Sequence, residues 1–348
     1  METESKIRYL DSLQIFRGIA ALMVVIHHSV GSLNYYHHIN NPFLDGVGMF
    51  GKFGVDFFFI LSGFIISYAS FHKYNNPNAF QNYIKNRVIR IYIPYLPVGI
   101  AMYILYAYLP SVSNGIREIS LFTSLTLFPY GSPALSVAWT LTFELFFYFV
   151  FSISFFSRKA WNYFVLIWVL SILIFNYTSL QNIAITQTPI LNLFLSPYNI
   201  EFILGYLLSL IIIHNIKIRS RYLFIIFTFL FFLFLGIQNL KYITIVFYLN
   251  YLFSSMAFLI LYFVISRFTK KIKGNSIMML VGNASYSIYL IHNPLQIFIL
   301  RTYPKINSVP SLILSLGLVL FLSSIFGYLY YLTFEKKCMN FIKSKIIS

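Results

Sequence analysis

Long runs of apolar residues recur along the whole chain and are separated by short polar segments. A helix needs about 20 predominantly apolar residues to cross a bilayer, and ten runs approach or exceed that length. The predicted spans are 10–30, 53–71, 89–109, 137–157, 160–177, 197–214, 222–237, 242–265, 280–300 and 311–333. The apolar stretch 119–129 is too short to cross unaided, and we expect it to be re-entrant or interfacial. The pattern predicts an all-α integral membrane protein, a polytopic bundle of about ten transmembrane helices.

Composition supports this fold class and excludes a soluble domain with one anchor. Hydrophobic residues make up 59% of the 348 and charged residues only 10%, whereas a soluble chain carries about 25% charge. No small-residue cleavage site follows the first apolar run, so we expect it to be retained as a span. No repeat or linker divides the chain, which predicts a single domain over residues 1–348. The single cysteine, Cys338, rules out an intramolecular disulfide.

The distribution of Lys and Arg predicts the orientation in the membrane. If the spans alternate, nineteen of these residues lie on one side and five on the other, while Arg17 lies within the first span. Cytoplasmic loops carry the excess of positive charge, so both termini are expected in the cytoplasm. Topology and anionic headgroups of membrane lipids therefore account for the net charge of +16, and we expect no nucleic-acid partner.

Two ionisable residues share one face of the first span. Arg17 and His28 are eleven residues apart, which is about three helical turns and about 16 Å along the axis. The neighbouring His27 points about 100° away and is the weaker candidate. Ionisable residues are costly in lipid, so they usually face the protein interior and are often functional.

Further ionisable residues fall inside other spans at related depths. Asp56 lies near the outer start of the second span, at a depth like that of His28, while Glu144 and Glu201 enter with the fourth and sixth spans. His292 lies past the middle of the ninth. Together they indicate the wall of an internal passage. Glu201 is equally consistent with an ordinary interhelical hydrogen bond.

Six motifs, in order along the chain, resemble those of a known family. They are LDSLQIFRGIAALMVVIHHS (10–29), GKFGVDFFFILSGFIISY (51–68), RVIRIYIPY (87–95), AWTLTFELFFYF (138–149), EFILGYLL (201–208) and LVGNASYSIYLIHNPL (280–295). They resemble the acyltransferase-3 family of integral membrane O-acyltransferases, whose opening signature is an arginine, ten residues and a histidine. Arg17 and His28 match that signature, and Glu335 stands where the family often has an acid after the last span.

The resemblance implies acyl transfer, commonly of an acetyl group from cytoplasmic acetyl-CoA. The acceptor would be a hydroxyl of a surface glycan such as O-antigen or exopolysaccharide, or of its lipid-linked precursor. The location implied is the plasma membrane, the inner membrane of a bacterium. Some members carry a soluble esterase-like domain after the membrane part; this chain ends a few residues beyond Glu335, so no such domain is expected.

The candidate residues suit this chemistry. Arg87 and Arg90 lie three residues apart near the inner end of the third span, and with Arg17 they could hold the phosphates of acetyl-CoA. They are equally explained as positively charged anchors on the cytoplasmic side. A neutral His28 would serve as general base toward a sugar hydroxyl, with Asp56 orienting its ring. Alternatively, His28 accepts the acyl group itself and passes it on.

The remaining candidates complete the predicted site. We place Glu144 with His28 and Asp56 in the catalytic set. The predicted substrate path is lined by Tyr148, Glu201, Tyr286 and His292. No metal is expected, because the histidines lack a convincing ligand set.

Other function classes are also compatible with ten spans and buried ionisable residues. The main rival is a secondary transporter or a flippase of a lipid-linked glycan, and a catalytically silent scaffold is a third possibility. An acyltransferase changes the mass of its acceptor, whereas a flippase changes only its location. No phosphate-binding Walker A loop is present, so ATP-driven transport is not indicated.

Overall fold

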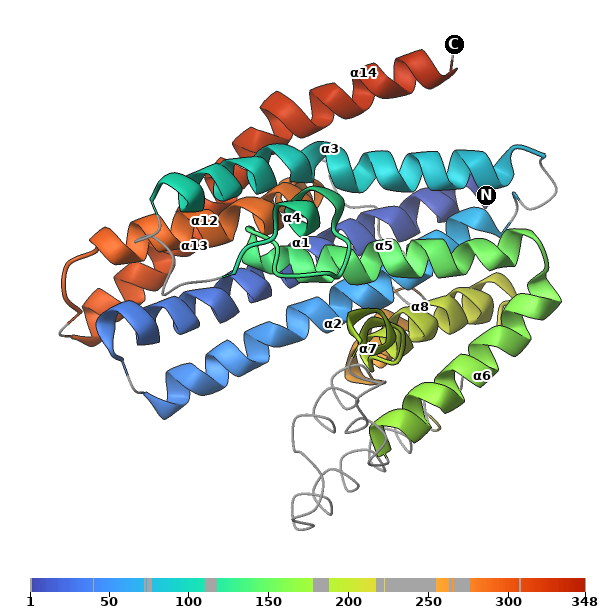
Figure 1. The fold of residues 1–348 in the computed structure, drawn as a ribbon, viewed down its shortest axis with the longest axis horizontal. Coiled ribbons are helices and arrows are strands. Elements are labelled where there is room, and N and C mark those ends of the chain that lie inside the picture. The colour runs from blue at the N-terminus through green and yellow to red at the C-terminus, as the bar shows by residue number, and fades with distance from the viewer. Residues whose placement is uncertain are drawn as a thin grey trace. The chain divides into compact units, whose positions relative to one another are not determined.

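A computed structural model describes most of the chain. The described residues are 2–39, 41–71, 73, 77–109, 118–177, 188–216, 222, 255–262, 265, 276–306 and 308–347. Over these ranges the chain is helical, and the extended pairing is confined to one isolated bridge between Ile119 and Ser132. The prediction of an all-α fold is confirmed for this part of the chain (Figure 1).

The described helices fall into longer and shorter elements. The longer elements are α1 (Glu2–His37), α2 (Pro42–Ser70), α3 (Ala79–Tyr108), α5 (Trp139–Phe151), α6 (Arg158–Tyr177), α8 (Tyr198–Ile213), α12 (Ser285–Thr302), α13 (Val309–Tyr330) and α14 (Lys336–Ile347). The shorter ones are α4 (Leu121–Thr126), η2 (Ser136–Ala138), η3 (Ser152–Phe155), α7 (Pro189–Phe194), α11 (Ile277–Asn283) and the π-helical turn η6 (Tyr331–Glu335).

Seven helical segments in the described ranges are long and apolar enough to cross a membrane. They are Asp11–His37, Pro42–Ser70, Ala79–Tyr108, Ser136–Phe155, Arg158–Asn176, Pro189–Ile213 and Val309–Ile342. Each overlaps one of the predicted spans, so the protein is a multi-pass membrane protein. The predicted start of the second span, residue 53, is wrong as a helix boundary, because α2 already begins at Pro42.

Three predicted spans are not among these seven. Most of 222–237 and 242–265 lies outside the described residues. The region 280–300 is helical, as α11 and α12, but α12 carries polar residues that lower its hydropathy, and many of them are buried in protein. The count of ten spans and the cytoplasmic termini stay predictions. The stretch 119–129 contains only the six-residue α4, consistent with a segment too short to cross.

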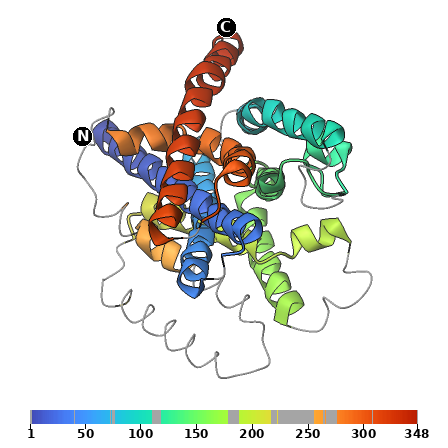
Figure 2. The ribbon, with the colours of Figure 1, turned by 90° about the vertical axis from the view of Figure 1, so that its left-hand side faces the viewer.

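The chain divides into two compact units. The first comprises residues 1–13, 56–79 and 153–272, and the second comprises 14–55, 80–152 and 273–348. In the second unit, α12 and α13 lie side by side as an antiparallel pair (Figures 1 and 2). This unit contains most of the predicted site residues.

Glycines allow very close helix packing in both units. In the second unit, a Cβ added at Gly51 of α2 would lie 2.6 Å from the Met23 carbonyl oxygen of α1. In the first unit, a Cβ at Gly63 would lie 2.1 Å from the Phe202 carbonyl oxygen of α8. Small residues let helix backbones approach in lipid, so these glycines are packing positions.

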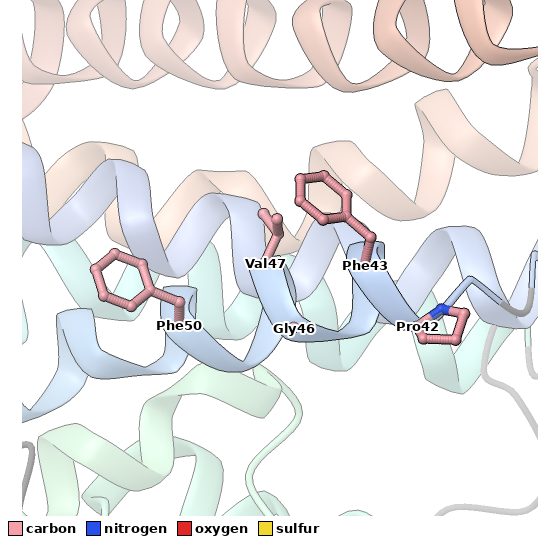
Figure 3. A pocket seen from close by; sticks show the side chains of 5 residues that line it. All are labelled: Pro42, Phe43, Gly46, Val47 and Phe50. Atoms are coloured by element: carbon pink, nitrogen blue, oxygen red, sulfur yellow. The ribbon is translucent and has the colours of Figure 1, made fainter.

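One side of the first turns of α2 is open. Pro42, Phe43, Gly46, Val47 and Phe50 line an apolar recess of about 450 Å³, and all of them belong to α2 (Figure 3). A Cβ at Gly46 would meet no atom within 4 Å. The first two turns of α2 therefore pack on one side only.

Candidate active site

Charged and phenolic side chains from five elements gather in the second unit. They interact electrostatically and form what we call the arginine cluster: Arg17, Arg87, Arg90, Glu144, Tyr148, Tyr286 and Glu335. Three arginines face two carboxylates, so the cluster favours an anionic ligand. The structure thus brings the three predicted phosphate-binding residues together with Glu144, Tyr148 and Tyr286.

Helix α1 holds Arg17 through a chain of amide contacts. Arg17 Nη1 donates a 2.9 Å hydrogen bond to Gln14 Oε1, and Gln14 Nε2 donates to Asn283 Oδ1 of α11 at 3.1 Å. The backbones meet beside it, because a Cβ added at Gly18 would lie 2.9 Å from the Gly282 nitrogen. The guanidinium is therefore held by a polar and a steric contact between α1 and α11.

Aromatic rings surround Arg87 on α3. Its guanidinium carbon lies 5.8 Å from the ring centroid of Tyr83 and 5.6 Å from that of Tyr148, within the range of cation–π attraction. The Tyr148 hydroxyl donates to Glu144 Oε1 one turn earlier on α5. Arg87 Nε is buried and has no hydrogen-bond partner in the described part of the chain. An unsatisfied guanidinium N–H is what a phosphate oxygen would complete.

Glu335 enters the cluster from η6. The Ser287 hydroxyl of α12 donates to Glu335 Oε2, and the carboxylate interacts electrostatically with Arg17 and Arg90. Inserted π-helical turns occur frequently at functional sites. Here the turn places the Glu335 carboxylate where it interacts with Arg17 and Arg90.

Two histidines from different helices form a second group. The His28 and His292 rings have centroids 5.3 Å apart, and His292 is fully buried on α12. His292 Nδ1 contacts the Ile288 carbonyl oxygen at 3.3 Å. We call His28 and His292 the histidine pair. By contrast, His27 Nδ1 bonds the Gly48 carbonyl oxygen of α2 at 2.8 Å, a packing contact consistent with its weaker candidacy.

Helices α5 and α12 join the two groups. Tyr289, one turn before His292, has its ring centroid 5.6 Å from that of the histidine. Its hydroxyl lies 2.7 Å from Thr140 Oγ1 and donates to the Val137 carbonyl oxygen at 3.1 Å. Thr140 is one turn before Glu144 on α5. A continuous polar stripe thus connects the arginine cluster with the histidine pair.

Asp56 and Glu201 belong to the first unit. Both are buried, with 2% and 1% of their surface exposed, and both interact electrostatically with Tyr198 at the start of α8. The predicted role of Asp56 in orienting His28 and that of Glu201 in the substrate path stay predictions.

Comparison with known families decides the class of the protein. A family model described as an acyltransferase domain matches residues 10–331, nearly the whole chain. The chain belongs to the acyltransferase-3 family. No curated protein and no solved structure matches it. The protein is a membrane acyltransferase.

The candidate site includes polar residues to which the sequence motifs assign no role. The family resemblance indicates the position of Glu335 but no role for it, and the motifs give no contact for Gln14, Thr140, Ser287, Tyr289 or Gln296. Their polarity within apolar segments was the available signal. Their partners come from distant parts of the chain, which a single sequence does not reveal. Among the described residues, no three His, Cys, Asp or Glu side chains converge as a metal-ligand set.

Proposed function

We propose that this acyltransferase moves an acetyl group from cytoplasmic acetyl-CoA to a hydroxyl of a surface glycan or its lipid-linked precursor, in the plasma membrane of a bacterium. The observation that carries the proposal is the pairing of an arginine cluster with a histidine pair in one unit. The two are separated along α1 by eleven residues, about 16 Å. A donor with charged phosphates at one end and a thioester at the other suits such a separation.

The donor end of the proposed site rests on Arg17, Arg87 and Arg90. Planar guanidinium groups bind phosphate oxygens through paired N–H donors, and the cluster has more arginines than carboxylates. When bound, acetyl-CoA would supply the acyl group as an activated thioester. Glu144 and Glu335 would keep the guanidinium groups from repelling one another when no phosphate is present.

The transfer end rests on His28. A sugar hydroxyl is a weak nucleophile, so a neutral imidazole that accepts its proton as the new ester bond forms would speed the reaction. His28 lies half-buried on α1, with the second imidazole beside it. We place His28 as general base; covalent transfer through the His28 ring is the second chemical route.

Mass spectrometry of surface glycans tests the proposal. Cells expressing the native chain, His28→Ala or His27→Asn would be compared at matched membrane levels. We expect a mass gain of one acetyl group per modified unit with the native chain and with His27→Asn. With His28→Ala we expect that gain to fall by about 100-fold or more, the usual contribution of a general base.

Each other outcome is informative. An equal gain with His28→Ala would remove His28 from the mechanism. A change in the location of a lipid-linked glycan, with no change in its mass and no acetyl-CoA consumed by purified protein, would favour a flippase. Consumption of acetyl-CoA without a glycan product would retain acyl transfer and refute the glycan as acceptor.

A further inference from the structure

His292 carries a buried nitrogen whose chemistry is unused by the function proposed above. Its Nδ1 faces the Ile288 carbonyl oxygen, which can only accept, so in a neutral ring Nδ1 carries the proton. Nε2 then has a free lone pair. That atom is buried and has no hydrogen-bond partner within the described ranges. Buried polar atoms are usually satisfied, so an unpartnered nitrogen beside another imidazole points to a hydrogen bond that forms during function.

We propose that Nε2 of His292 accepts a hydrogen bond from the His28 ring and so sets which His28 nitrogen is the base. The inference rests on the proposed function and assigns His292 as a positioning residue for it. In a neutral imidazole one nitrogen donates and the other accepts. A His28 ring that donates to His292 must therefore present its other nitrogen, unprotonated, to the acceptor hydroxyl.

The distance between the rings suits this role. Two imidazoles joined by an N–H···N hydrogen bond of about 3 Å have ring centroids about 5 Å apart, and here the centroids are 5.3 Å apart at an interplanar angle of 41°. Catalytic hydrogen bonds are often poorly aligned before substrate binds and tighten afterwards.

A second contact fixes the spacing of the two helices beside the pair. Gln296, one turn beyond His292 and fully buried, donates to the Val25 carbonyl oxygen at 2.9 Å and to Ser29 Oγ at 3.0 Å. Both acceptors lie on α1, on either side of His28. This brace holds α12 against α1 where the rings meet.

The reaction balances with both histidines returned to their starting state. The hydroxyl proton moves to the free nitrogen of His28 as the ester O–C bond forms and the thioester C–S bond breaks. The positive charge on His28 is stabilised through its N–H to Nε2 of His292. The same proton then passes from His28 to the thiolate, giving the free thiol of CoA.

Nitrogen NMR provides a direct test that does not require turnover. The chain has seven histidines, so protein labelled with ¹⁵N-histidine in lipid nanodiscs gives a tractable spectrum, with His28 and His292 assigned by substitution. With acetyl-CoA bound, we expect a single tautomer for His28 and a nitrogen–nitrogen coupling across the hydrogen bond; without it, we expect the coupling to be weaker or absent. Absence of the coupling in both states would overturn the proposal.

Substitutions separate positioning from packing. In His292→Leu we expect mixed His28 tautomers and a fall in the rate of acetyl transfer of about 100-fold or more. In His292→Gln the amide oxygen can replace Nε2, so the His28 tautomer should be kept and the rate of acetyl transfer should stay within about 10-fold of the native rate. His37→Asn, nine residues beyond His28 on the same helix, is the matched control and should leave the His28 tautomer unchanged. An unchanged tautomer in His292→Leu would refute the proposal, and the role would pass to Asp56 if Asp56→Asn disturbed it instead. A wild-type protein with the coupling but no acetyl transfer would refute the proposed function and retain the histidine pair.

Discussion

Replacing Gly51 by alanine should force α1 and α2 apart next to the histidine pair. The new Cβ would lie 2.6 Å from the Met23 carbonyl oxygen and 2.8 Å from the His27 backbone nitrogen. Ordinary contacts begin at 3.4 Å, so the helices must separate by up to 0.8 Å at this point. Both obstacles are backbone atoms, which cannot rotate away as a side chain can.

The displacement has two measurable consequences. Overpacking of a tight interface typically costs about 1–3 kcal/mol, and about 2–4 °C of melting temperature corresponds to each kcal/mol in a mid-sized protein. A misplacement of about 1 Å in an active site can reduce the rate by about 100-fold, so we expect a loss of at least about 10-fold in acetyl transfer.

Two other glycines provide matched controls. Gly46 lies on the same helix as Gly51, and Gly31 lies on the same helix as His28, but a Cβ at either would meet nothing within 4 Å. Their alanine variants should match or exceed the native stability, because alanine favours the helix. Melting in detergent, followed by size-exclusion chromatography, and acetyl transfer at matched protein levels would be measured for all three. If Gly51→Ala behaved like Gly46→Ala in both assays, the close approach of α1 and α2 would be wrong.

Three further predictions address the polar contacts. Arg17→Lys should raise the KM for acetyl-CoA by about 10-fold or more, because lysine lacks the planar pair of N–H groups that arginine offers to a phosphate. Measuring the rate of acetyl transfer against acetyl-CoA concentration checks this. An unchanged KM would remove Arg17 from the acetyl-CoA site. Tyr289→Phe and Thr140→Val should each destabilise the protein. Because both substitutions remove the same contact between hydroxyl groups, their double-mutant cycle should give a coupling free energy of about 0.5–1.5 kcal/mol. If the two losses of stability simply added, that contact would be contradicted. Gln296→Met should destabilise by about 1–3 kcal/mol, because it removes two buried hydrogen bonds to α1. Gln14→Met should destabilise less, because the two bonds that it removes, to Asn283 and from Arg17, are only part-buried; a reversed order of melting temperatures would count against the role of Gln296.

Hydropathy was sufficient to predict the long helices, because each must bury its backbone polar groups within a continuous apolar segment. It was less informative for α12, whose Ser287, His292 and Gln296 are tolerated because protein, and not lipid, surrounds them. The helix boundary at Pro42 was also missed, since residues 42–52 contain glycines and charged residues that interrupt the apolar run.

The sequence selects the residues of the candidate site but not the contacts between them. Motif resemblance selected Arg17, His28, Glu144 and His292, and the structure places them in one unit. The pairing of Gln14 with Asn283 joins residues 269 positions apart, and that of Thr140 with Tyr289 joins residues 149 apart. Such contacts depend on how helices are ordered in the bundle, and no local pattern records that order.

Because the turn η6 lies between them, the side chains of α14 are rotated about the helix axis from where a regular continuation of α13 would place them. A π-helical turn contains one residue more than an α-helical turn, and one residue corresponds to about 100° of rotation about the axis. Replacing the π-helical hydrogen bonds by regular α-helical ones without deleting a residue would therefore rotate every side chain of α14 by about 100°, whereas deleting a single residue from 331–334 would absorb that change and leave α14 at about its present azimuth. Conversely, α13 and α14 need no common helical repeat, so the membrane-facing pattern of one places no constraint on the pattern of the other.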